Sequence, residues 1–197
     1  MTGTRKSLAE VRRALALVDA GQAAEALAIY RRLLVEARKG GFETSYLHFA
    51  SAHACLALND LETAFEELTL AIARDPVCPG YRGSFEDLLR RIREALADPG
   101  RARDEPSTAG LYALLVRAGC ADVASHVVMG RHLLATGEWG AARRLADALT
   151  QLHPTSPEAW ELASEVAASV DPRAAEQARQ QAAASATALL ARAAGSA

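Results

Sequence analysis

Apolar residues recur at three- and four-residue spacing along most of this chain, and short breaks of glycine, asparagine or proline separate the runs. This spacing puts the apolar side chains on one face of a helix, whereas a strand would alternate with a period of two. The first run predicts a helix from about Ser7 to Ala20, which Gly21 ends. A second run starts at Ala23, so the chain opens with two helices joined by a tight turn.

A helix–turn–helix pattern is clearest between His126 and Pro154. Apolar positions at helical spacing lie on both sides of the break at 137–140, and the proline cannot continue the second helix. The next helix is predicted to start with Ser156 as its N-cap and Pro157 at its first helical position. This stretch is therefore a predicted pair of antiparallel helices with a further helix behind it.

The segment from Thr44 to Pro76 predicts another pair. Its first helix, which extends to Leu58, is apolar on nearly every side, and this indicates that neighbours cover it on both sides. Asn59 and Asp60 make the turn, and a second apolar stripe follows as far as the proline. We therefore expect this pair to lie in the middle of a stack of helices.

These pairs resemble tetratricopeptide repeats, whose period is about 34 residues. The resemblance is carried by the pair ending at Pro154 and by residues 56–76, LALNDLETAFEELTLAIARDP. Trp160 stands at a position where the family has a tryptophan, which keeps the register between the last two units. The resemblance implies an all-α fold: an α-solenoid of about four to five antiparallel helix pairs, forming a right-handed superhelix with a concave groove.

The middle repeat is predicted to be enlarged. Pro76 and Pro154 lie 78 residues apart, which is two repeats of about 34 residues plus roughly ten more. Its first helix is predicted over 84–96, with Ser84 and Asp87 resembling a capping box. We predict helix pairs over 1–98, an exposed loop at 99–106 rich in proline, glycine and charge, and further pairs over 107–197 that end in a capping helix.

Composition excludes several classes of protein. The 22 basic and 24 acidic residues nearly cancel, and the arginines near the loop alternate with acidic residues, so we expect no nucleic-acid partner. The 3 cysteines fit neither a disulfide framework nor a zinc ribbon. No apolar run is long enough for a membrane span or a signal peptide, which favours a cytoplasmic location. Lysine occurs only at Lys6 and Lys39, a usage typical of a GC-rich bacterial genome.

No pattern of catalytic or metal-binding residues is present. The histidine pairs His48/His53 and His126/His132 do not share a helical face at i, i+4 spacing, as a zinc pair would. The adjacent carboxylates Glu66–Glu67 point apart, so we expect them to be solvated. The sequence therefore predicts a protein that is not an enzyme, with no cofactor and no metal.

The predicted binding surface is the concave groove, because in this family the first helix of each pair supplies the ligand contacts. The expected groove residues run from aromatic and apolar to acidic along three first helices: Tyr46, Phe49, His53 and Leu56; Val127, Arg131 and Leu134; and Glu158, Glu161 and Glu165. Two alternatives stay open. Tyr46 and Phe49 belong to the core if the helix is turned the other way, and Val127 and Arg131 face either a ligand or the next helix.

The function expected from this resemblance is a non-catalytic scaffold that binds a protein or peptide segment in its groove. Chaperone tails are not the expected ligand, because the groove positions of the two clearest pairs include no lysine and only Arg131 is cationic. One alternative is a self-assembling oligomerisation module that forms homo-oligomers. The other is a repeat domain that regulates, or is appended to, an enzyme such as a bacterial glycosyltransferase.

Overall fold

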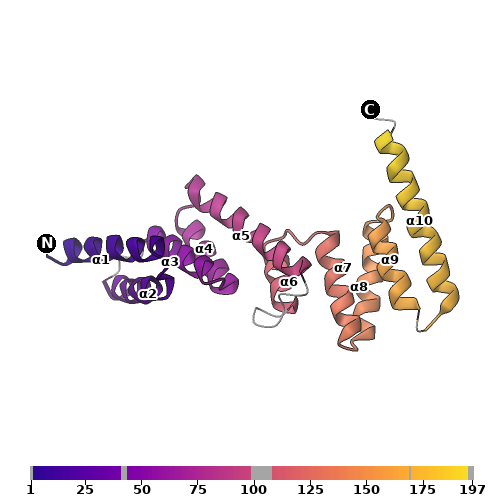
Figure 1. Ribbon diagram of the computed structural model, residues 1–197, viewed down its shortest axis with the longest axis horizontal. Helices are drawn as coiled ribbons and strands as arrows, with labels where there is room; N and C mark the ends of the chain where they lie inside the picture. Colours follow the sequence, from indigo (N-terminus) through magenta and orange to yellow (C-terminus); the bar gives the residue numbers. More distant parts are fainter. Residues whose placement is uncertain (1, 41–43, 99–107, 169, 195–197) are drawn as a thin grey trace. The chain divides into compact units, whose positions relative to one another are not determined.

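Helices make up the regular secondary structure of the computed structural model, which describes residues 2–40, 44–98, 108–168 and 170–194 (Figure 1). Within these ranges there is no strand, and the prediction of an all-α fold built from helix pairs is confirmed. The chain divides into two compact units. The amino-terminal unit holds the described residues as far as Ala95, and the carboxy-terminal unit holds those from Leu96 onward.

The described residues of the amino-terminal unit form five helices that follow one another along the chain: α1 (Thr2–Asp19), α2 (Ala23–Gly40), α3 (Ser45–Ala57), α4 (Leu61–Arg74) and α5 (Pro79–Ala97). Helices α1 to α4 pack on one another in sequence. The rings of Phe65 in α4 and Phe85 in α5 lie 5.3 Å apart between centroids. The interior is filled by one face of each helix, with Tyr30, Leu68, Leu88 and Ile92 fully buried.

The carboxy-terminal unit consists of α6 (Thr108–Arg117), α7 (Val123–Ala135), α8 (Trp139–Leu152), α9 (Pro157–Ala167) and α10 (Pro172–Ala194). Neighbouring helices again pack in sequence, and α7 also touches α9. Their core is one cluster of small and branched side chains: Val127, Leu133, Ala142, Ala146, Leu149, Ala159, Leu162 and Val166. Alanine at several of these positions lets the helices approach closely, as the alanine-rich composition suggests.

The predicted turns have the expected chemistry. Asn59 adopts a left-handed backbone conformation with φ 59°, and the side chain of Asp60 then accepts a hydrogen bond from the Thr63 amide at 3.1 Å to cap α4. Gly137 is left-handed as well, with φ 81°, at the turn between α7 and α8. These residues reverse the chain within two or three positions, so consecutive helices run antiparallel.

The predicted start of α9 is confirmed. Ser156 caps the helix by accepting a hydrogen bond from the Ala159 amide at 3.3 Å, and Pro157 occupies the first helical turn. The indole N–H of Trp160 donates to the Pro154 carbonyl oxygen at 2.9 Å. This bond ties the tryptophan of one repeat to the proline that ends the previous repeat, which explains the fixed spacing between the two residues.

The predicted start of α5 is wrong. The helix begins at Pro79 rather than at position 84, so Ser84 lies inside it and makes no capping box. Proline is compatible with a first helical turn because the amide it lacks would be unpaired there, and burial of Tyr81 against Phe49 of α3 stabilises this turn. The loop predicted at 99–106 lies outside the described residues.

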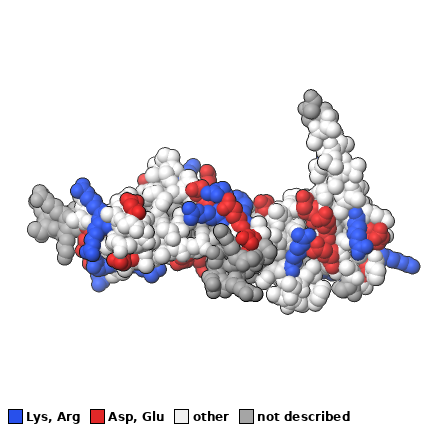
Figure 2. Space-filling view, viewed as in Figure 1, with Lys and Arg blue, Asp and Glu red and all other residues white. Residues whose placement is uncertain are grey.

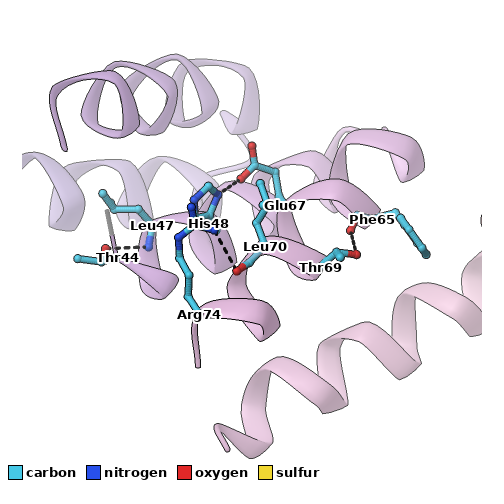
Figure 3. A network of polar contacts seen from close by, with 8 residues as sticks. All are labelled: Thr44, Leu47, His48, Phe65, Glu67, Thr69, Leu70 and Arg74. Atoms are coloured by element: carbon cyan, nitrogen blue, oxygen red, sulfur yellow. Dashed lines mark hydrogen bonds and ion pairs between the residues drawn. The ribbon is translucent and has the colours of Figure 1, made fainter. Parts of the chain in front are cut away.

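A buried polar pair joins α3 to α4. The His48 side chain is 0% exposed, and its Nδ1–H donates to Glu67 Oε2 at 2.6 Å. Figure 3 shows the imidazole pointing from α3 toward this carboxylate, while the Arg74 guanidinium reaches the Leu70 carbonyl oxygen. The prediction that Glu67 is solvated is therefore wrong: its side chain is only 17% exposed, because it serves as the acceptor for a core histidine.

The last helix is about twice as long as the helix it packs on. α9 has 11 residues and α10 has 23, and α10 extends well past the end of α9 (Figure 1). Its buried positions, Ala175, Ala178 and Ala182, all lie in the half that contacts α9. In the other half, Leu189 and Leu190 are 45% and 72% exposed. The predicted capping helix therefore leaves two leucines uncovered by the described residues.

Candidate functional site

The open side of α3 carries the aromatic residues that the sequence singled out. Tyr46 is 42% exposed and Phe49 is half-buried, whereas Leu47, Ala54 and Cys55 on the other side are buried. Because α3 is apolar on nearly every side, the core takes the face that contacts α2 and α4. Tyr46 is left exposed on the remaining face, and Phe49 lies half-buried beside it.

An aromatic cluster forms where α3 meets α5. The Phe49 ring lies 4.5 Å from the His53 ring, 4.8 Å from the Tyr81 ring and 6.4 Å from the Tyr46 ring, measured between centroids. The hydroxyls of Ser45 and Tyr81 are hydrogen-bonded at 3.3 Å. We call Tyr46, Phe49, His53 and Tyr81 the aromatic cluster. Pairs at these separations stabilise one another. Tyr81 is only 7% exposed, so the cluster joins the exposed Tyr46 to the core of this unit.

Beside the aromatic cluster lies a hollow of about 250 Å³. It is lined by residues of three helices of this unit: Val18, His53, Leu56, Ala57, Ser84, Asp87 and Arg91. His53 Nε2 is hydrogen-bonded to the Ser84 hydroxyl at 3.2 Å, and the Arg91 guanidinium donates to the Leu56 carbonyl oxygen at 3.4 Å. The hollow thus combines an apolar floor with an imidazole, a carboxylate and a guanidinium.

Four residues of this surface were missed at the sequence level: Tyr81, Ser84, Asp87 and Arg91. They lie on α5, whose first turn contains Gly80 and Gly83 and therefore has a weak helical pattern. If the helix is started at Pro79, positions 81, 84, 87 or 88, and 91 follow at helical spacing and share a face. That periodicity was the available signal.

We predict that the free energy of unfolding falls in acid because His53 takes up a proton. Partial burial, followed by the positive charge of Arg91, holds the pKa of His53 below its ordinary value of 6.5. The unfolded chain therefore takes up this proton more readily, so the free energy of unfolding is fully retained above about pH 6.5 and falls as the pH drops toward the folded-state pKa.

Urea unfolding at pH 7.5 and pH 5, compared between the wild-type chain and His53→Asn, isolates this contribution, which the variant should lack. NMR titration of the ring gives the pKa directly. A His53 pKa at or above 6.5 in the folded chain contradicts the prediction.

In the carboxy-terminal unit, Val127 does not belong to an open surface. It is 5% exposed and forms part of the core cluster, and Leu134 packs against the same cluster. Arg131 faces the next repeat: its Nη2 donates to Glu165 Oε1 at 2.6 Å, and its Nε lies 3.0 Å from Oε2. The expectation that Val127 contacts a ligand is corrected by its burial. Arg131 is likewise engaged within the chain, and its pKa is raised by this hydrogen bond.

Two of the three glutamates predicted on α9 also make hydrogen bonds within the chain. Glu158 accepts a hydrogen bond from the Ser156 hydroxyl at 2.6 Å, which lowers the pKa of Glu158, and Glu165 is the partner of Arg131. Glu161 is exposed and borders a shallow depression together with Glu165 and Arg179. Of the predicted groove residues, His53 and Leu56 line the hollow beside Tyr46 and Phe49, and Glu161 and Glu165 line the depression at α9.

Among the described residues there is no group of three or more His, Cys, Asp or Glu side chains placed to hold a metal ion. Cys55 is buried, and desolvation raises the pKa of its thiol to about 12, which disfavours the reactive thiolate. No helix of the described residues is long and apolar enough to cross a membrane.

One part of the chain matches a known family of repeats. Residues 123–166, which cover α7, α8 and nearly all of α9, match the family model of the tetratricopeptide repeat. No curated protein matches the chain. Among solved structures, the chain is similar to the TPR2AB-domain:pHSP90-complex of yeast Sti1, with 12% identity and a TM-score of 0.43, covering 91% of this chain and 77% of that one. It is also similar to MamA MSR-1 C2, with 13% identity and a TM-score of 0.37, covering 92% and 97%.

Proposed function

We propose that this chain, in which residues 123–166 form a tetratricopeptide repeat, is a non-catalytic scaffold that binds a segment of another protein. The aromatic cluster of α3 and α5 is the proposed binding surface, with the adjacent hollow as its polar end. One observation carries the proposal: Tyr46 is 42% exposed and packs beside the half-buried Phe49, whose ring is in turn held against Tyr81. Aromatic residues held in this way are the usual anchors of protein interfaces.

The chemistry of the surface favours a peptide with an apolar anchor and a charged or polar neighbour. The rings of Tyr46 and Phe49 would cover an aliphatic or aromatic side chain. His53 and Ser84 at the hollow offer hydrogen bonds to backbone groups, and Arg91 and Asp87 offer either sign of charge. An amphipathic helix or an extended segment satisfies these requirements, since both present side chains at regular intervals along one edge.

The test uses crosslinking to locate the partner and affinity to measure the contribution of the rings. A photo-crosslinking amino acid at Tyr46 should capture a partner in the native cell, whereas the same group at Glu36, on the exposed side of α2, should not. With the captured partner purified, Tyr46→Ala/Phe49→Ala should raise the dissociation constant at least ~10-fold, since anchors of this kind contribute about 2 kcal/mol or more.

The matched control is Val35→Ala. Val35 is an apolar residue of α2 that is about as exposed as Tyr46, and its loss should leave binding unchanged. The helical circular-dichroism signal of both variants should equal that of the wild-type chain. Unfolding of the double alanine variant would show that the two rings serve the core, and equal capture at Tyr46 and Glu36 would contradict the proposed surface.

A further inference from the structure

A large cavity of the carboxy-terminal unit lies in a place that the sequence did not indicate. It is a groove of about 910 Å³ formed where α8, α9 and α10 run side by side. Both tryptophans of the chain line it, together with Asp147, Val170, Ala174 and Ala178. We call this cavity the tryptophan groove.

The walls of the tryptophan groove are mainly apolar, and its charged residues are Asp147, Asp171 and Arg143. Trp139 is 50% exposed, Val170 is still more exposed, and Trp160 is held in place by its hydrogen bond to the Pro154 carbonyl. Asp147 and Asp171 stand at the rim, where Asp147 is 3.9 Å from the guanidinium of Arg143. Two accessible indole rings beside small alanines make a surface that a helix with large apolar side chains can fill.

The same unit contains a segment with complementary properties. The carboxy-terminal half of α10, residues 183–194, carries the exposed Leu189 and Leu190, several alanines and a single charge, that of Arg192. This half is about 18 Å long at the helical rise per residue. Figure 2 shows it as a projection of uncharged surface, and Figure 1 shows that α9 does not accompany it.

We propose that the projecting half of α10 from one copy of this chain docks in the tryptophan groove of a second copy. The leucines would pack against Trp139 and Trp160, the alanines would allow close approach of the helix backbone, and Arg192 would lie near Asp147 and Asp171. The projecting half cannot fill the groove of its own chain, because α10 is one continuous helix whose other half already forms a wall of that groove. The occupant is therefore a second molecule.

Docking of this kind is heterologous, since the projecting helix and the groove are different surfaces of the same unit. Two copies that each dock their helix in the other's groove form a closed dimer. If docking is not reciprocal, further copies can add and an open linear assembly forms. Both outcomes make the average mass depend on concentration. The surfaces involved belong to the carboxy-terminal unit, so this self-association is independent of the partner proposed for the aromatic cluster.

The first test is sedimentation of the full chain across a dilution series from micromolar to submillimolar concentration. The wild-type chain should self-associate, and both Leu190→Glu and Trp139→Glu should weaken this association at least ~10-fold, as expected for loss of a central apolar contact. The matched control is Leu152→Glu: Leu152 and Leu190 are 73% and 72% exposed, but Leu152 does not line the groove. This control should associate like the wild-type chain.

The second test mixes the two defective variants. Leu190→Glu retains an intact groove and Trp139→Glu retains an intact projecting helix, so an equimolar mixture should form a heterodimer through one complete interface. Circular dichroism should show that both variants are folded; Glu is well tolerated at the first position of α8, where negative charge is favourable.

A wild-type chain that is monomeric at every concentration overturns the proposal. A mixture of the two variants that fails to associate also overturns it. That result would indicate another kind of contact, such as pairing of α10 with α10 or unspecific apolar contact, which does not require one intact helix and one intact groove. Loss of association in Leu152→Glu to the same degree would likewise overturn it.

Discussion

Replacing Gly130 by valine is expected to lower the free energy of unfolding of the carboxy-terminal unit by about 3 kcal/mol, the upper part of the range for overpacked cores. A Cβ added at Gly130 of α7 would lie 2.5 Å and 2.8 Å from the two terminal methyl carbons of Leu162 in α9. Leu162 is fully buried, so its side chain cannot move without displacing the rest of the core cluster. Valine adds two further carbons and has little freedom at χ1 in a helix.

Tryptophan fluorescence during urea unfolding measures this effect in one unit, because both tryptophans of the chain lie in the carboxy-terminal unit. The control is Gly83→Ala in α5, where an added Cβ meets nothing within 4 Å. Because Gly83 lies in the other unit, this variant should leave the fluorescence transition unchanged. Circular dichroism, which reports both units, should show that it stabilises the chain by up to ~1 kcal/mol through helix propensity. The double variant Gly130→Val/Leu162→Ala checks the cause. If its loss in free energy of unfolding equals the sum of the losses in the two single variants, close packing between these residues does not explain the effect of Gly130→Val.

The second large effect is expected at His48. Replacing this fully buried histidine by alanine should cost about 3 to 5 kcal/mol, since it combines a cavity with the loss of a hydrogen bond to a charged carboxylate. The 2.6 Å bond to Glu67 joins α3 to α4, and Glu67 would be left largely buried with its acceptor unpaired by His48. Thermal or urea unfolding followed by far-ultraviolet circular dichroism measures the loss.

His53→Ala is the matched control, because His53 lies on the same helix but is exposed and makes its side-chain hydrogen bond to Ser84. It should cost much less than His48→Ala. Glu67→Gln retains an acceptor oxygen and removes the charge, so its cost should lie between the two. Equal losses for the two histidine variants would show that the buried pair contributes little beyond an ordinary surface contact.

The helices and their turns were predictable because the relevant physics is local. Apolar spacing identifies the buried face of each helix, and left-handed Asn59 and Gly137 mark chain reversals without any knowledge of the fold. The cap at Ser156 is of the same kind, since all of its partners lie within three residues. This is why the start of α9 could be predicted to the residue.

The parts that could not be predicted depend on partners distant in sequence. The start of α5 is stabilised by Tyr81 packing on Phe49, a contact across 32 positions that outweighs the weak propensity of two glycines. His48 is in the core because Glu67, on the next helix, accepts its hydrogen bond. Helix α3 is apolar on nearly every side, so its sequence alone does not determine which face is open.

The candidate site, too, was predictable where it depends on local spacing and not where it depends on distant partners. Tyr46, Phe49, His53 and Leu56 are found together because one helix sets their spacing. Val127 was misplaced, because burial in the core cluster depends on how α7 meets α9. The tryptophan groove left no pattern in the sequence at all, since its walls come from three helices whose separation is set by tertiary packing.

The order in which the helices pack also bears on how the protein is made. The main contacts in both units join helices that are adjacent, or next but one, in the chain. Such contacts close only short loops, which makes folding fast. Helices α1 to α4 can therefore assemble on the ribosome while the later helices are still being synthesised, and the nascent chain never has to hold its apolar faces uncovered until the last residue is added.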